Sequence, residues 1–267
     1  MKLAFSTLGV PGVPLDDVLN LATTHGFHGV ELRAHPEERI HPGIGLTERA
    51  DAAARFKDAG VEIVGIAGYA QVAAPGEDEP VLDEIRSLLT LARDLGAPFI
   101  RVFPGGGTEQ SADEADATAA RRLGTAAEYA ADFGVRILME THDSHRTGAA
   151  ATRVLGAVGH RNAGALWDLM HTWLGGESPG DSYAALSPYL GYVQVKDIAS
   201  AEDTTPLALG EGVLPIAECV DVLLSGEHRD GWLCWEYEKR WYEAAAPLPE
   251  LLGQGREFLS RLLNRAA

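Results

Sequence analysis

Cysteine is scarce in this sequence: only Cys219 and Cys234 occur in 267 residues. The two form no C-x-x-C pair and have no histidine-rich metal spacing around them, which indicates reduced thiols rather than a disulfide framework. Basic residues are also few, with 22 lysines and arginines against 39 aspartates and glutamates. The resulting formal charge of -17 repels phosphate backbones and anionic membrane surfaces. We therefore expect no nucleic acid partner.

Long hydrophobic runs are absent as well. No stretch of 18 apolar residues occurs, and the apolar run within the opening MKLAFSTLGVPG is too short for a signal peptide. These features predict a cytoplasmic protein with no membrane association. No low-complexity tract or linker divides the chain, and 267 residues are enough for a single domain with a large core.

What the sequence does contain is a repeat of short apolar runs, with segments of helical periodicity between them. Several helical segments end in glycine, as at Gly26 and Gly60, where a left-handed C-cap is expected. The runs with strand character are LAFSTL at 3–8, GVELR at 29–33, VEIVGIAG at 61–68, FIRVF at 99–103, RILME at 136–140, AGALWD at 163–168, LGYVQV at 190–195 and WLCWE at 232–236.

Eight such units, with strands too apolar to have a solvent-facing side, favour an α/β fold with a single (β/α)8 TIM barrel over residues 1–267. The main alternative is a doubly wound open sheet. Such a sheet normally carries a glycine-rich phosphate turn after its first strand, and TLGVPGVP at 7–14 lacks the spacing G-x-G-x-x-G. We therefore predict the barrel.

Polar residues recur at the carboxyl ends of the predicted strands, where barrel enzymes carry their catalytic groups. Glu140 and His142 are two residues apart, as are Gln194 and Lys196, so each pair lies on one side of its strand. The valines that alternate with Gln194 and Lys196 suit the helix-facing side. The polar pair should therefore face the barrel mouth.

Three of the carboxylates, Glu140, Asp168 and Glu236, come from three strands of a closed ring and would repel one another. Either some remain protonated or a cation neutralises them. We predict one divalent metal ion bound by these three residues, with the amide carbonyl of Gln194 as a fourth oxygen ligand. An all-oxygen set favours Mn2+ or Mg2+, while Co2+ and Zn2+ remain possible.

Each of these residues also has a plain structural interpretation. A single glutamate at a strand end is usually solvated or paired, and His171 could be an ordinary loop histidine. Lys196 could form a salt bridge to Asp197 or Glu211. The recurrence of such groups at equivalent ends of the fifth to eighth strands favours a functional site.

Five motifs along the chain are METHD at 139–143, WDLMH at 167–171, YVQVKD at 192–197, LGEG at 209–212 and WEYEKRW at 235–241. In this order they resemble the sugar phosphate isomerase/epimerase family of xylose-isomerase-like TIM barrels, and the likeness runs from the first strand to the final helix. In that family the fifth, sixth and eighth strands supply acidic metal ligands. The resemblance therefore implies Glu140, Asp168 and Glu236 as metal ligands, with His142, His171 and Lys196 on the substrate.

One position departs from the family pattern, because Gln194 stands where most members place a metal-binding histidine. Glutamine is a neutral oxygen ligand and a weaker donor than imidazole, which makes zinc less expected. The same residue counts against the related AP endonucleases, whose trinuclear zinc site needs several more histidines than these strand ends offer.

Barrels of this kind move a proton next to a carbonyl in a small polyhydroxylated substrate. We therefore expect an isomerase: a metal-dependent sugar or sugar-phosphate isomerase or epimerase that works through an ene-diolate. Glu140 and Glu236 would exchange the proton with the substrate carbon. The expected substrate-binding residues are His142, His171, Lys196, Arg101 and Trp173.

Two other functions remain open. An inosose-type dehydratase would use the same ligands, and a metal-free sugar-binding barrel would make Gln194 the mark of a degenerate site. The segment 236–250 is long for a barrel loop and could form a lid or a subunit contact in a homo-oligomer. The sequence does not identify the sugar or its phosphorylation. It also does not distinguish isomerisation, epimerisation and dehydration.

Overall fold

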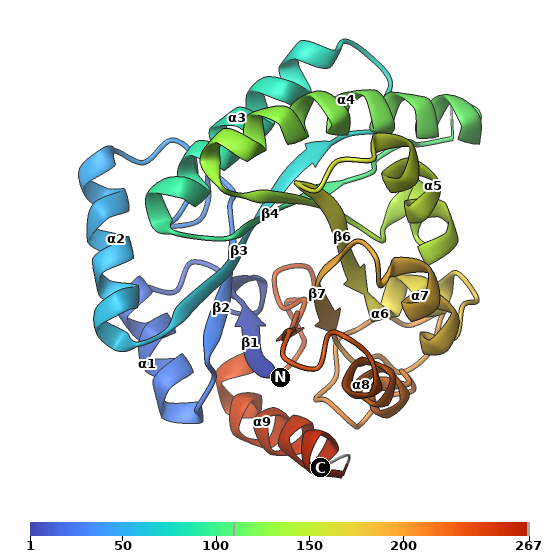
Figure 1. Ribbon diagram of the computed structural model, residues 1–267. Coiled ribbons are helices and arrows are strands. Elements are labelled where there is room, and N and C mark those ends of the chain that lie inside the picture. Colours follow the sequence, from blue (N-terminus) through green and yellow to red (C-terminus); the bar gives the residue numbers. More distant parts are fainter. Residues whose placement is uncertain (109, 266–267) are drawn as a thin grey trace.

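The computed structural model describes residues 1–108 and 110–265 and has the predicted closed (β/α)8 barrel (Figure 1). In this part of the chain eight parallel strands pair in chain order, and β8 closes the ring by pairing with β1. The strands are β1 (Lys2–Ser6), β2 (Gly29–Arg33), β3 (Glu62–Gln71), β4 (Phe99–Phe103), β5 (Arg136–Glu140), β6 (Ala163–Asp168), β7 (Leu190–Val195) and β8 (Trp232–Trp235).

Helices surround the ring of strands (Figure 1). They are α1 (Leu15–His25), α2 (Leu46–Ala59), α3 (Asp78–Leu95), α4 (Ala112–Phe133), α5 (Gly148–Val158), α6 (Leu169–Leu174), α7 (Pro179–Leu186), α8 (Ile216–Ser225) and α9 (Leu248–Arg265), with short 3-10 helices η1 (Thr7–Gly9) and η2 (Asp143–His145). Gly26 and Gly60 follow α1 and α2 with φ of 71° and 66°, which confirms the predicted left-handed caps.

The predicted strand bounds are correct for β2, β4, β5, β6 and β7 and differ elsewhere. The first strand stops at Ser6 rather than at position 8, because the Ser6 hydroxyl accepts the N–H of Leu8 at 3.3 Å and begins η1. The third strand continues to Gln71, past an irregularity in its pairing with β4. The eighth ends one residue before Glu236.

Side chains alternate between two apolar layers, as the period of a strand requires. Val193 and Val195 are buried in the large cluster between strands and helices, so they face outward as predicted. The opposite side of the strands fills the barrel interior with a smaller apolar cluster, made of Ala4, Val64, Leu138, Leu166, Tyr192 and Cys234. At the carboxyl ends of β5 to β8 the next inward position carries a polar residue, so the apolar cluster lies directly beneath a polar layer.

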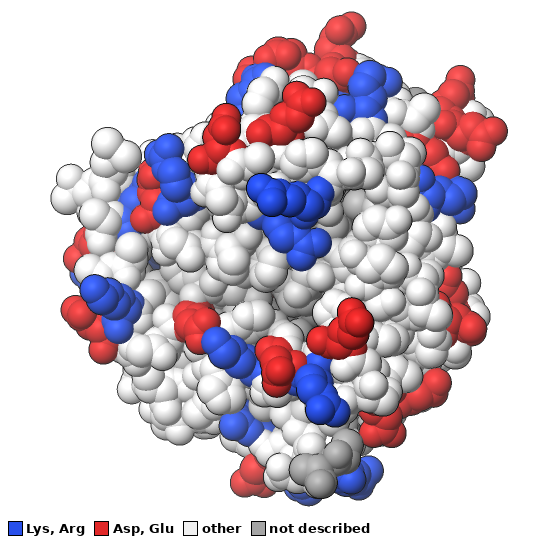
Figure 2. All heavy atoms as spheres, in the orientation of Figure 1, with Lys and Arg blue, Asp and Glu red and all other residues white. Residues whose placement is uncertain are grey.

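The surface carries both signs of charge. On the face in Figure 2, acidic and basic side chains are scattered among uncharged ones, and neither sign covers a continuous area. No helix among the described residues is both long enough and apolar enough to cross a bilayer.

Candidate active site

The four predicted metal ligands lie together in the polar layer of the barrel. Glu140, Asp168, Gln194 and Glu236 are each at most 4% exposed. They come from four consecutive strand ends, and Asp168 is the direct partner of Gln194 across β6 and β7. The structure therefore brings these residues to one end of the barrel, as their positions in the sequence predict.

Lys196 lies among the carboxylates of this layer. Its Nζ is 2.8 Å from Asp168 Oδ2 and 2.7 Å from Glu238 Oε1, and it also contacts Glu236 Oε2. Burial alone would lower the pKa of Lys196, but the three carboxylates together raise it well above its ordinary value. A permanent ammonium thus pairs with two of the predicted metal ligands.

Asp197, the residue considered as a simple partner for Lys196, has a different role. Its carboxylate accepts the backbone N–H groups of Gly210 and Gly212 at 2.9 and 3.0 Å, and that of Leu214 at 3.2 Å. Asp197 therefore holds the loop after β7 in place, and the side chain of Lys196 lies in the barrel interior without pairing with it.

Gln194 presents its nitrogen to its neighbours. Nε2 donates to Glu31 Oε2 at 2.8 Å and to Glu236 Oε1 at 3.0 Å, and Tyr192 donates to the same Glu31 oxygen at 2.5 Å. Burial and the charge of Glu236 raise the pKa of Glu31. The carbonyl oxygen of Gln194 is buried and has no hydrogen-bond partner among the described residues, so an acceptor is left over in this layer.

Asp168 divides its two oxygens between structure and site. Oδ1 accepts the N–H groups of Met170 and His171 at 2.8 and 3.3 Å, which caps α6. Oδ2 faces Lys196. Because the cap starts the helix at the strand end, His171 is placed one turn later beside the barrel mouth.

Arg101 is the partner of Glu140. Its Nη1 donates to Glu140 Oε2 at 2.7 Å, and its guanidinium lies 3.8 Å from the centroid of the Phe103 ring. Burial raises the pKa of Glu140 to about 7, although the charge of Arg101 acts in the opposite direction. Glu140 can therefore gain or lose a proton near neutral pH.

Glu140 also belongs to a second cluster. Each of Glu140, His142 and His171 offers one ligand atom, and these atoms lie within 4.8 Å of one another. The two imidazole rings are 4.0 Å apart at their centroids. Burial, helped by the charges of His142 and Lys196, lowers the pKa of His171 well below its ordinary value, so its ring is neutral and keeps a free lone pair.

A small cavity of about 50 Å³ opens above this layer. Its lining residues are Leu8, Tyr69, Arg101, Phe103, Glu140, His142, His171, Glu236, Glu238 and Trp241. Trp173, predicted to contact the substrate, lies on α6 and packs against the outer apolar core. Among the tryptophans it is Trp241 that reaches the cavity.

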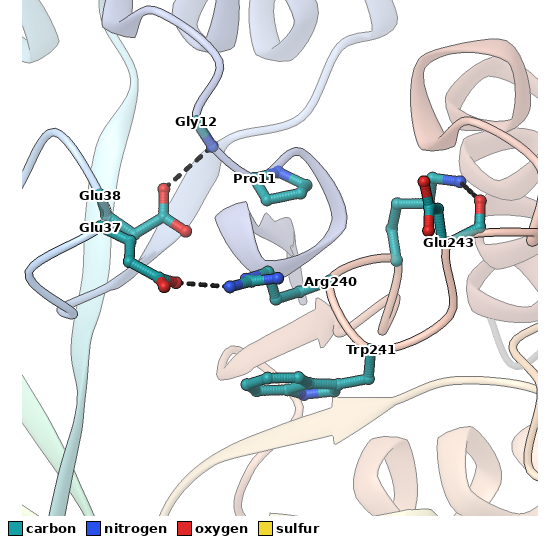
Figure 3. Close-up of a pocket in the computed structure, with 8 residues that line it drawn as sticks. Pro11, Gly12, Glu37, Glu38, Arg240, Trp241 and Glu243 are labelled. Atoms are coloured by element: carbon teal, nitrogen blue, oxygen red, sulfur yellow. Dashed lines mark hydrogen bonds and ion pairs between the residues drawn. The ribbon is translucent and has the colours of Figure 1, made fainter.

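The segment predicted as a lid or subunit contact lies over a larger outer cavity of about 590 Å³, which shares Trp241 with the small one (Figure 3). Arg240 donates to Glu37 at 2.6 Å and so joins the loop after β8 to the loop after β2. The segment continues without a regular element until α9 begins at Leu248. Whether it serves as a lid or a subunit contact remains a prediction.

Five residues of the cavity lining lie outside the predicted site, namely Leu8, Tyr69, Phe103, Glu238 and Trp241, and alternation could have found two of them. Phe103 lies two residues after Arg101 and Glu238 two residues after Glu236, so each shares the side of its neighbour. Tyr69 could not be found in this way, because it lies beyond the predicted end of the third strand.

The buried polar layer holds more negative than positive side chains. Four buried carboxylates, those of Glu31, Glu140, Asp168 and Glu236, surround two buried cationic side chains, Lys196 and Arg101. Fully ionised, this group keeps an excess negative charge, which either protons or a bound cation must balance. The free carbonyl oxygen of Gln194 adds a neutral hard donor to the set.

Comparison with known proteins gives one family. A family model described as a xylose isomerase-like TIM barrel matches residues 19–262. The chain is 27% identical over 194 residues to the 3-dehydroshikimate dehydratase of Bacillus anthracis, covering 71% of this chain and 69% of that protein. It is 28% identical over 205 residues to a putative hydroxypyruvate isomerase of Streptomyces coelicolor, covering 68% and 71%.

Solved structures share the fold along almost the whole chain. The D-psicose 3-epimerase of Clostridium cellulolyticum H10, solved with D-tagatose, superposes with a TM-score of 0.83 at 15% identity, covering 98% of this chain and 99% of the other. The IolI protein, solved with a zinc atom, superposes with a TM-score of 0.81 at 16% identity, covering 100% and 99%. At these identities the likeness concerns the fold.

Proposed function

The chain belongs to the xylose isomerase-like TIM barrel family, and from that premise we propose that it is a metal-dependent enzyme that moves a proton next to the carbonyl of a small hydroxylated substrate. The first candidate reaction is isomerisation or epimerisation of a sugar or sugar phosphate. The observation that carries the proposal is the buried ring of Glu140, Asp168, Gln194 and Glu236 beneath the cavity. These four residues are the proposed ligands of one Mn2+ or Mg2+ ion.

The proposed roles follow from the contacts of the side chains. When bound, the cation would supply Lewis acidity toward the carbonyl and a neighbouring hydroxyl. Glu140 and Glu236, which both line the cavity, exchange the proton with the substrate carbon. Return of the proton to the opposite face of the same carbon inverts that carbon, and delivery to the neighbouring carbon gives an isomer. The neutral ring of His171 orients a hydroxyl, and Leu8, Phe103 and Trp241 exclude water.

Dehydration is a second candidate, because a relative at 27% identity is a 3-dehydroshikimate dehydratase. It begins with the same removal of a proton next to a carbonyl. The two reactions diverge when a hydroxyl on the neighbouring carbon leaves instead of the proton being returned. Product analysis by mass spectrometry separates them, since dehydration lowers the mass of the product and isomerisation does not.

Metal content tests the ligand set. Purified wild type, Glu236→Ala and His171→Ala would be incubated separately with Mn2+ and Zn2+, freed of excess ion and analysed for metal. We expect about one Mn2+ per chain in wild type and in His171→Ala, and much less in Glu236→Ala, because only Glu236 belongs to the oxygen set.

Two other outcomes of the metal analysis would contradict the proposed ligand set. Metal kept by Glu236→Ala but lost by His171→Ala would replace the oxygen set with Glu140, His142 and His171. No retained metal in any of the three proteins would reject the metal-dependent enzyme and favour a metal-free sugar-binding barrel.

A further inference from the structure

Arg101 has more hydrogen-bond donors than the protein uses. A guanidinium carries five N–H groups, and among the described residues the hydrogen bonds of Arg101 employ Nη1 alone, toward Glu140. Nε is buried and has no hydrogen-bond partner among the described residues, and the whole residue is only 4% exposed. Buried donors are ordinarily satisfied, so the Nε group of this side chain, beside a cavity, lacks a binding partner.

We propose that the free edge of Arg101 binds a carboxylate group of the substrate, which makes the substrate a small hydroxyketone acid rather than a neutral sugar. This inference rests on the proposed function and narrows its substrate class. Because Glu140 takes Nη1, the edge formed by Nε and Nη2 is left, and its two parallel N–H groups match the two oxygens of a carboxylate. The guanidinium lies over the Phe103 ring, with its central carbon 3.8 Å from the ring centroid, and this contact limits the movement of the guanidinium.

The surroundings select a singly charged group. Arg101 is the one arginine or lysine among the residues that line the cavity, and the carboxylates of Glu140, Glu236 and Glu238 line it as well. A phosphate dianion would bring two negative charges toward these carboxylates, whereas a carboxylate brings one. The cavity of about 50 Å³ also suits a compound of few heavy atoms, since one water molecule needs about 10–15 Å³.

The test uses probes that differ in one group. Hydroxypyruvate and dihydroxyacetone are the same hydroxyketone with a carboxylate or a hydroxymethyl group, and dihydroxyacetone phosphate carries a phosphate. Calorimetric titration would give the dissociation constant of each for wild type and Arg101→Met, with Mg2+ present. The matched control is Arg33→Met, which removes another buried arginine whose donors already bind Glu38 and Tyr69.

We expect wild type to bind hydroxypyruvate about 10- to 100-fold more tightly than dihydroxyacetone, which is the range for a hydrogen bond to a charged group. Arg101→Met should abolish that ratio, and Arg33→Met should keep it. Arg101→Lys, which retains the charge without the fork, should give an intermediate ratio and guards against a folding defect. Equal or absent binding of the two probes, or a ratio that survives in Arg101→Met, would overturn the inference. Tighter, Arg101-dependent binding of the phosphate would replace the carboxylate with a phosphate.

Solvent-deuterium uptake into the same probes, read by mass spectrometry, separates this inference from the proposed function. Selective, Arg101-dependent binding without uptake into either probe would reject the proton-transfer function and leave the carboxylate site standing. Equal deuterium uptake into both probes, with the same ratio of uptake in Arg101→Met, would support the proton-transfer function and reject the carboxylate site.

Discussion

Two buried arginines in this barrel differ in how many of their donors find a partner. Arg122, on α4, is 1% exposed, and its Nε donates to Asp78 at 2.8 Å. Its Nη1 and Nη2 donate to main-chain carbonyls at positions 72, 74, 76 and 77, at 2.7 to 3.2 Å. Arg101 is buried almost as well and donates to Glu140 alone among the described residues.

The difference separates a structural residue from a binding residue. Arg122 binds the carbonyl groups of the loop between β3 and α3, including that of the buried Val72, which would otherwise lack this partner. Arg101 lies beside a cavity with its remaining edge unused. Burial alone therefore does not assign a role to an arginine, whereas the count of its satisfied donors does.

The largest expected effect is on stability and concerns Arg122. Arg122→Met keeps much of the side-chain volume but removes every donor to Asp78 and the loop carbonyls. We expect a loss of about 2 to 3 kcal/mol in the free energy of unfolding, the range for hydrogen bonds to a charged group and for a buried carbonyl left unpaired. Urea unfolding followed by circular dichroism measures it.

The control is Arg121→Met, because Arg121 binds the same Asp78 from the surface with a side chain 54% exposed. Its loss should cost about 0 to 1 kcal/mol, as for exposed ion pairs. Equal losses in both variants would mean that Asp78, and not the set of carbonyl contacts, explains the stability. The comparison between Arg122 and Arg101 would then lose its basis.

The partners of the two arginines should give opposite dependences of stability on pH. Burial raises the pKa of Glu140 from 4.5 to about 7, so the folded metal-free protein binds a proton that the unfolded chain releases. Its contribution to stability is present below pH 4.5 and is lost as the pH rises to 7. The hydrogen bonds from Arg121 and Arg122 lower the pKa of Asp78, so its contribution is present above pH 3.8 and is lost on acidification below it.

Unfolding of the chelator-treated protein between pH 3 and pH 8 measures both slopes. Glu140→Gln should remove the decline between pH 4.5 and 7 and leave the acid limb, and Asp78→Asn should change the acid limb alone. Mn2+ should also reverse the decline, since a metal binds the deprotonated carboxylate. A decline that persists in Glu140→Gln would assign it to another group, such as Glu31 or Glu238, whose pKa values are also raised.

The sequence predicts the barrel and the direction of its polar side chains, because both follow from the period of a strand. Alternation correctly turns Val193 outward, and Gln194 inward. It does not predict that Lys196 reaches Asp168 at the end of the neighbouring strand, because this contact depends on the stagger of the strands and on the reach of a flexible side chain. The unpaired donors of Arg101 cannot be predicted from the sequence for the same reason. A donor can be identified as unpaired only when the positions of all its neighbours are known.

The smallest expected effect concerns an exposed arginine. Arg240 and Glu37 join the loops over the outer cavity (Figure 3), but their side chains are 35% and 54% exposed, so water and salt weaken the pair. Arg240→Ala should leave the urea midpoint unchanged within error and should raise KM by less than about threefold. Wild type in 1 M salt should behave like the variant, because screening removes the same interaction. A tenfold rise in KM in Arg240→Ala, with the wild-type KM restored in Arg240→Lys, would contradict this expectation and make the loop contact part of substrate binding. An exposed arginine would then have a function that counting its satisfied donors does not reveal.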